Sequence, residues 1–65
     1  MKKLTKKQKR INDNRISRLY SENCSGIQIN IFDIGKIYKV AEANLDLNDE
    51  VLGKIIREYT LELAV

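Results

Sequence analysis

The sequence has no histidine, no proline and a single cysteine, Cys24, among its 65 residues. Without histidine there is no base of the usual kind to activate a serine or cysteine nucleophile. The lone cysteine cannot form an intrachain disulfide or complete a common zinc ligand set. The three glycines, Gly26, Gly35 and Gly53, lie too far apart for a phosphate-binding loop. We therefore expect a protein that is not an enzyme and has no cofactor and no metal site.

Carboxylates close enough for acid–base or calcium chemistry occur around residue 48. Asp46, Asn48 and Glu50 alternate as in a calcium loop, but the loop glycine and the twelfth-position glutamate are missing. Asn48 is a good helix cap, and Asp49 and Glu50 suit the positive end of the helix that would follow it. A structural role at a helix start is the better interpretation of these acids.

A chain of 65 residues forms one domain at most, and its core is small. We expect residues 1–65 to be a single domain, with a basic amphipathic helix in residues 1–23 and a helical core in residues 24–65. Its apolar stripes exceed what three short helices cover, so we expect a homo-oligomer or a larger partner. The start, MKKLTKKQKR, is not followed by an apolar run of signal-peptide or membrane-span length, which predicts a cytoplasmic protein and no membrane partner.

Positive and negative charges are segregated along the chain. Residues 1–18 contain eight of the twelve Lys and Arg and one acid, a balance of +7, whereas residues 19–65 have a balance of −4. Such asymmetry indicates the kind of partner and carries little information about the fold.

Residues 5–23 are predicted to form the first helix. Thr5 and Gln8 have the spacing of a capping box, in which each side chain bonds to a backbone amide at the helix start. At 100° per residue the apolar residues fall on one broad side: Leu4, Ile11, Ile16 and Leu19. The opposite side is basic and polar: Lys3, Lys7, Arg10, Asn14 and Arg18.

The segment 27–45 is ambiguous at its start. Ile27, Ile29 and Ile31 alternate with polar residues as in a strand, but a single short strand has no partner. Beyond Asn30 a helical spacing predicts a core helix near residues 30–44, with Asn30 or Ser25 as its cap. The buried stripe of this helix is expected to be Ile31, Ile34, Tyr38, Ala41 and Leu45. Phe32 falls off the stripe and is a candidate exposed anchor.

The third helix is predicted over residues 49–63, with Asn48 as its cap. Its apolar face is Leu52, Ile55, Ile56, Tyr59 and Leu63. The short connection before it favours an antiparallel pair with the second helix. Gly35 and Gly53 suggest close approach between helices or, in the case of Gly35, a kink. The expected fold is an all-α three-helix unit.

The basic helix is the feature with functional content. A lysine-rich stripe several turns long can follow a phosphate backbone, and asparagine and glutamine are base-reading residue types. The predicted binding residues are Lys3, Lys6, Lys7, Arg10, Asn14, Arg15, Arg18 and Phe32. The expected partner is nucleic acid, RNA or DNA, or a ribonucleoprotein.

Two resemblances accompany this prediction. The basic segment is similar in composition to arginine-rich RNA-binding peptides of some phages, over fewer than twenty residues. The whole chain resembles short accessory proteins of phages and mobile elements, including those that block host defence nucleases such as CRISPR complexes. That resemblance implies an alternative function, the inhibition of a larger host protein complex by protein–protein contact.

Overall fold

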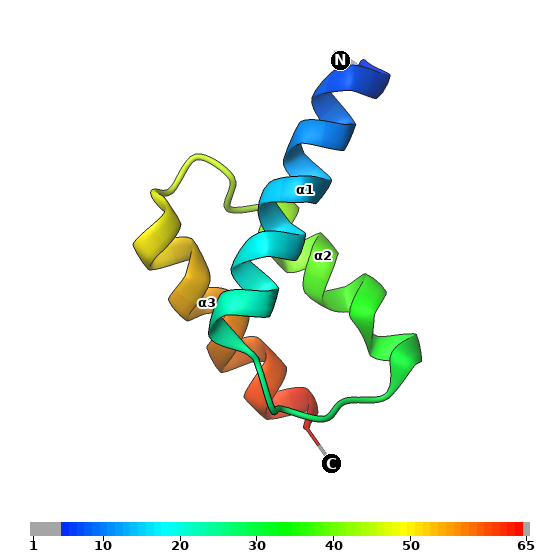
Figure 1. Cartoon of the computed structure of the whole chain (residues 1–65), viewed down its shortest axis with the longest axis vertical. Coiled ribbons are helices and arrows are strands. Elements are labelled where there is room, and N and C mark those ends of the chain that lie inside the picture. The colour runs from blue at the N-terminus through cyan, green and yellow to red at the C-terminus, as the bar shows by residue number, and fades with distance from the viewer. Residues whose placement is uncertain (1–4, 65) are drawn as a thin grey trace.

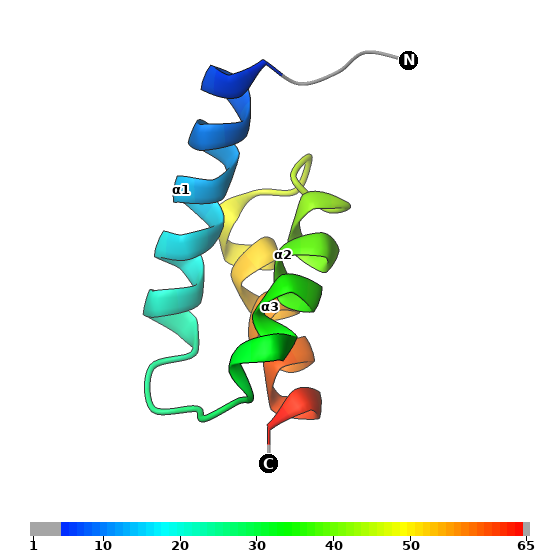
Figure 2. The ribbon, with the colours of Figure 1, turned by 90° about the vertical axis from the view of Figure 1, so that its right-hand side faces the viewer.

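The computed structural model describes residues 5–64, which form three α-helices and one short 3-10 helix. These elements are α1 (Lys6–Asn23), η1 (Ile31–Asp33), α2 (Ile34–Glu42) and α3 (Asp49–Leu63). Helices α1 and α3 run in the same direction and α2 runs back against them (Figures 1 and 2). Each pair of α-helices is in contact. The predicted all-α three-helix unit, with an antiparallel pair of second and third helices, is confirmed.

The caps predicted for the first and third helices are present. Thr5 Oγ1 accepts a hydrogen bond from the amide of Gln8 at 3.0 Å, and Asn48 Oδ1 accepts one from the amide of Val51 at 2.9 Å. The reciprocal bond of the capping box is absent within residues 5–64, because the Gln8 side chain instead donates to Asn12 Oδ1 at 3.1 Å. Local spacing therefore predicts where both helices begin.

The core lies where the three helices meet. Its buried side chains come from α1, α2, α3 and the turn after α1, and they are Ile16, Leu19, Cys24, Ile37, Ala41, Leu52 and Ile56. Tyr20, Tyr38 and Tyr59 pack against this cluster. For Tyr38 and Tyr59 this agrees with their positions on the predicted apolar stripes. Each buried isoleucine or leucine of the core contributes about 1.5–3 kcal/mol to the free energy of unfolding through its removal from water.

The structure decides the ambiguity in the middle of the chain and corrects the second helix. Residues 27–30 form neither helix nor strand, so the alternation of Ile27 and Ile29 reflects packing against the core and not a sheet. Asn30 is the cap, accepting from the amide of Phe32 at 3.0 Å, but the helix that it begins is the 3-10 turn η1. The second α-helix is consequently shorter than the predicted 30–44.

The predicted stripe is wrong at the start of this helix. Ile31 is 73% exposed and Ile34 is 36% exposed, whereas Ile37, which is not among the five stripe residues, is buried. A 3-10 turn advances about 120° per residue, so a spacing of 3.6 residues does not extend back to Ile31. Ile34 lies in the first turn of α2, at the margin of the core.

Gly53 allows the close approach that was predicted for it. A Cβ atom at this position would lie 2.6 Å from Asn23 Nδ2, the side chain that donates to the carbonyl of Leu19. Gly35 has no neighbour within 4 Å of such an atom, so close approach, one of the two roles predicted for it, is wrong there. At residue 53, a side chain would require the Asn23 amide to move from its present position.

Candidate functional site

The first turns of α1 project beyond the rest of the molecule (Figures 1 and 2). Residues 6–11, which we name the α1 extension, are all exposed, and the first fully buried residue of the helix is Ile16. Lys6, Lys7 and Arg10 of the α1 extension line a hollow of about 290 Å³. The residues are spaced three and four apart around Arg10, which puts their cationic groups on neighbouring parts of one surface.

These three cations have no acidic partner within residues 5–64. Lys9, by contrast, lies 3.6 Å from Asp13 in an exposed pair one turn apart. Such surface pairs contribute little and are readily exchanged for another anion. The positive end of the helix dipole lies at the same place and adds to the attraction for anions. The α1 extension is therefore an exposed concentration of positive charge.

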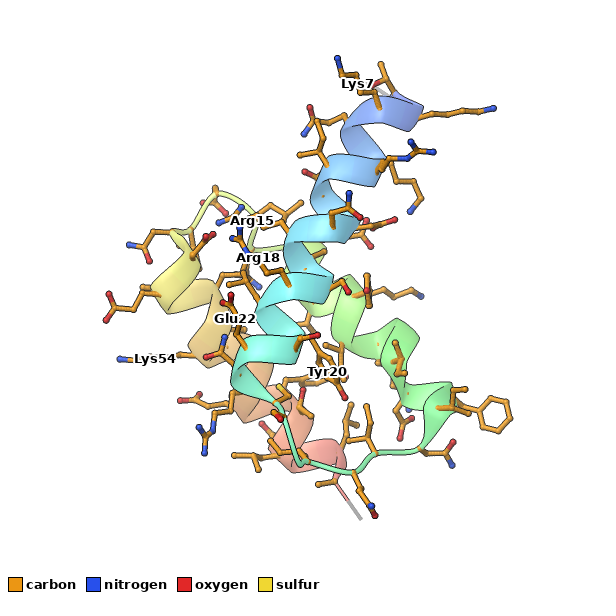
Figure 3. The ribbon with its side chains drawn as sticks, viewed as in Figure 1. Lys7, Arg15, Arg18, Tyr20, Glu22 and Lys54 are labelled. Carbon is orange, nitrogen blue, oxygen red and sulfur yellow. The ribbon has the colours of Figure 1, made fainter. Side chains whose placement is uncertain are left out.

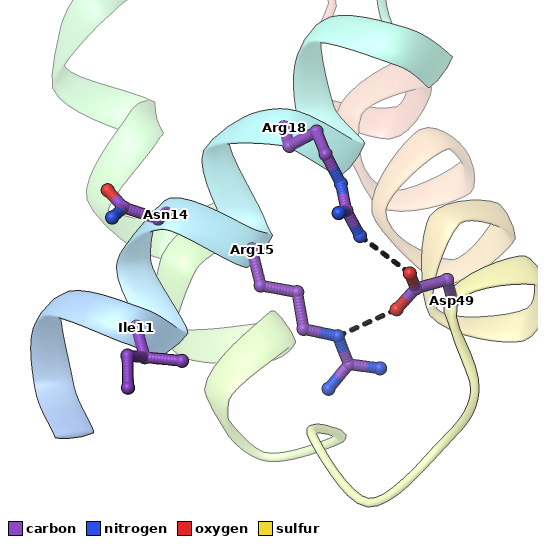
Figure 4. Close-up of a pocket in the computed structure, with 5 residues that line it drawn as sticks. All are labelled: Ile11, Asn14, Arg15, Arg18 and Asp49. Carbon is purple, nitrogen blue, oxygen red and sulfur yellow. Dashed lines mark hydrogen bonds and ion pairs between the residues drawn. The ribbon is translucent and has the colours of Figure 1, made fainter.

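Arg15 and Arg18, one and two turns further along, are instead held by Asp49 at the start of α3. Arg15 Nε donates to Asp49 Oδ1 at 2.7 Å, and Arg18 Nη2 donates to Asp49 Oδ2 at 2.6 Å. Figure 3 shows both arginines on the α3 side of α1, apart from Lys7, and Figure 4 shows them converging on Asp49. We name this group of three side chains the Asp49 clamp.

Arg15 also fixes the loop between α2 and α3. Its Nη1 donates to the carbonyl of Leu45 at 2.8 Å and its Nη2 to the carbonyl of Leu47 at 2.6 Å. The side chain is 26% exposed, against 55% for Arg18. Charge-assisted hydrogen bonds of this kind are among the stronger ones in proteins. Arg15 is thus mainly a structural residue, which its position in a basic stripe does not reveal.

The carboxyl group of Asp49 is tuned by its two partners. The hydrogen bond from Arg15 holds the pKa of Asp49 below its ordinary value of 3.8, and the charges of both arginines act in the same direction while partial burial opposes them. Because the pKa is lowered in the folded state, the carboxylate stabilises the fold above about pH 4, and this contribution is lost as the pH falls through the lowered pKa. The carboxyl group of Asp49 is therefore ionised at neutral pH.

A shallow recess of about 450 Å³ lies beside the clamp, lined by Ile11, Asn14, Arg15, Arg18 and Asp49. Ile11 is 50% exposed, so its predicted place on the buried side of the helix is wrong. Ile11 lies at one edge of the apolar side of α1. The residues of this helix that are buried are Ile16 and Leu19. Asn14 is exposed, and its side chain makes no hydrogen bond within the described part of the chain.

Phe32 is 84% exposed, in agreement with its position off the apolar stripe. Together with Ile31 and Ile34 it forms an apolar patch on η1 and the start of α2. Figure 1 places this segment at the opposite end of the molecule from the α1 extension. The apolar patch and the α1 extension are therefore separate surfaces.

The structure thus divides the residues selected from the sequence into three groups. Lys6, Lys7 and Arg10 lie together in the α1 extension. Asn14, Arg15 and Arg18 lie around the recess. Phe32 lies apart from both, and Lys3 is outside the described residues. The contact of Asp49 with Arg15 and Arg18 could not be predicted from the sequence. Asp49 lies 34 positions after Arg15, and no local spacing connects the two.

Comparison with known proteins gives no relative: no family model, no curated protein and no solved structure matches this chain. Among residues 5–64, no group of three or more Cys, Asp or Glu side chains could hold a metal ion. In the same part of the chain, none of the helices has the length and apolar character needed to cross a membrane. The charged surface of α1 is therefore the basis on which a function can be inferred.

Proposed function

We propose that this chain is a small, non-enzymatic helical protein that binds nucleic acid in the cytoplasm, alone or within a ribonucleoprotein, through the α1 extension. The observation that carries the proposal is the hollow lined by Lys6, Lys7 and Arg10 on a helix end that projects from the molecule. All three side chains are exposed, and none is neutralised by an acid within residues 5–64.

The physical basis is the release of counterions from a phosphate backbone. Each phosphate that a lysine or arginine neutralises frees condensed cations, and this gain is the main source of affinity in sequence-independent binding. A projecting helix end can reach a phosphate backbone without contact between the nucleic acid and the acidic remainder of the chain. The segregation of charge, +7 in residues 1–18 and −4 in residues 19–65, favours this orientation.

Binding should weaken steeply as salt is added. If three to six cations of residues 2–10 contact phosphates, the logarithm of the association constant should fall with the logarithm of the salt concentration with a slope of about −2 to −5, the shallower values applying to single strands. Fluorescence anisotropy with a labelled random pool of 20-nucleotide DNA and RNA, between about 50 and 300 mM salt, measures this slope. A flat salt dependence, or binding that does not saturate, would contradict the proposal.

The apolar patch favours a second candidate, an accessory protein that inhibits a host defence nuclease complex by protein–protein contact. An exposed phenylalanine with exposed isoleucines one position before it and two positions after it is the kind of residue that anchors a protein interface.

For this candidate, Phe32→Ala should weaken the capture of one stoichiometric nuclease complex by about tenfold or more. Treatment with a nuclease that removes nucleic acid should leave the capture unchanged. Leu61→Ala, at a residue that is 50% exposed on α3, is the matched control. Equal loss in both variants would exclude Phe32 as the anchor.

A further inference from the structure

The asparagine and glutamine side chains of α1 differ in whether they already make a hydrogen bond within the protein. Gln8 and Asn12 are bonded to each other, Nε2 to Oδ1 at 3.1 Å. Asn14 has no hydrogen bond from its side chain within residues 5–64 and is exposed. Asn23, the fourth such residue of α1, donates to the carbonyl of Leu19, so Asn14 is the one of the four without a side-chain hydrogen bond within residues 5–64.

Asn14 lies on the face of α1 that points away from the core. It precedes the buried Ile16 by two residues, about 200° around the helix. Lys7 precedes Asn14 by seven residues, close to two full turns, so the two share this face, and Ile11 lies between them. Figure 2 shows α2 and α3 on one side of α1 and no other element on its opposite side. The outward face is thus open along its length.

Building on the proposed function, we propose that the outward face of α1 lies in the major groove of duplex DNA and reads an A·T base pair through Asn14 and Ile11. An asparagine amide pairs in bidentate fashion with adenine N6 and N7, and an apolar side chain contacts the thymine methyl group. At a spacing of three residues, Asn14 and Ile11 are neighbours about 5–6 Å apart at Cβ, suited to the two bases of one pair. Lys7 and Arg10 lie beside the phosphates, and Arg18 has donors left after its single bond to Asp49.

The shape of the surface favours duplex DNA over duplex RNA. A helix of about 10–12 Å diameter fits the major groove of B-form DNA, which is about 12 Å wide. The major groove of A-form RNA is too narrow for side chains to read. The outward side of α1, which α2 and α3 leave uncovered (Figure 2), is therefore matched in width to the groove of DNA.

The placement of the aromatic residues argues against recognition of single strands. Proteins that bind single-stranded nucleic acid stack its bases on exposed aromatic side chains. Here Tyr20, Tyr38 and Tyr59 pack against the core, and Phe32 belongs to η1, a segment far from the α1 extension (Figure 1). The outward face of α1 offers cations, an amide and an isoleucine, which suit groove readout and not stacking.

The first experiment compares ligands of one sequence with the full-length chain. Anisotropy is measured with a labelled 20-base-pair DNA duplex, the RNA duplex of the same sequence and each single strand, all at 0.1 M salt. The DNA duplex should bind about tenfold or more tightly than the others. Equal or tighter binding of RNA or of a single strand overturns groove readout while the salt-dependent binding of the proposed function stands. Absence of saturable binding to every ligand overturns both.

The second experiment isolates the contribution of Asn14. Duplexes selected from a random pool should share an A·T pair at one position, and Asn14→Ala should lower the affinity for the selected duplex by about 5- to 150-fold. Affinity for an unrelated duplex should stay within about twofold, because phosphate contacts are unchanged. Asn12→Ala, two residues away in the same helix, is the control and should keep the preference. A preference that survives Asn14→Ala, in a variant with an unchanged circular dichroism spectrum, overturns the assignment of Asn14.

Discussion

Reversal of Lys6, Lys7 and Arg10, the three cations of the α1 extension that line the hollow, should lower the affinity for nucleic acid by about 100-fold or more at 0.1 M salt. In the variant Lys6→Glu, Lys7→Glu, Arg10→Glu, three attractive phosphate contacts become repulsive, so the loss exceeds that of simple removal. The fold should survive, because all three side chains are exposed and lie outside the core. Acids in the first turn also suit the positive end of the helix dipole better than lysines do.

The matched control carries the same change of net charge at another place. Lys39→Glu, Lys54→Glu, Arg57→Glu alters three exposed cations of α2 and α3 that have no ion pair within residues 5–64. The affinity of this control variant for nucleic acid is measured in the same anisotropy titration. It should fall by no more than about fivefold, because only the long-range electrostatic field of the protein is changed. If both variants lose affinity equally, net charge and not the α1 extension determines binding.

Loss of the Arg15 side chain should destabilise the fold by about 2–3 kcal/mol. Arg15→Ala removes hydrogen bonds to two backbone carbonyls and to Asp49, and it leaves the partly buried carbonyls of Leu45 and Leu47 without this donor. For a chain of this size, urea unfolding followed by circular dichroism should show the midpoint lowered by about 2–3 M, since the free energy of unfolding falls by about 1 kcal/mol per molar urea.

Arg18→Ala provides the comparison within the same clamp. Arg18 makes a single bond to Asp49 from a side chain that is 55% exposed, so its removal should cost less than about 1 kcal/mol. A similar loss in the two variants would show that the loop carbonyls contribute nothing and that the ion pairs with Asp49 determine the effect.

The parts of the fold that the sequence predicts are those with local causes. Thr5 and Asn48 cap the helices that follow them, and the spacing of Leu52, Ile56 and Tyr59 predicts the inner face of α3. In each case the interacting residues are three or four positions apart. Propensity, capping and periodicity then agree, and the element forms where they indicate.

The errors occur where the outcome depends on a distant partner or on a change of helix type. The 3-10 turn η1 alters the angular relation between Ile31 and Ile37, so the stripe rotates. Ile11 is apolar and correctly spaced, but no element covers it. The bonds from Arg15 join residues about 30 positions apart, and only the folded chain shows that this basic residue is largely occupied.

The separation of the α1 extension from the core has a consequence for how this chain can change over evolutionary time. Most substitutions that alter a binding surface also alter stability, and a small domain has little stability to lose. In residues 6–11 the side chains are exposed, whereas Ile16 and Leu19 hold the same helix in the core. Mutations in the α1 extension can therefore change the charge and shape of this surface at almost no cost to folding, so the surface can vary over evolutionary time independently of the core.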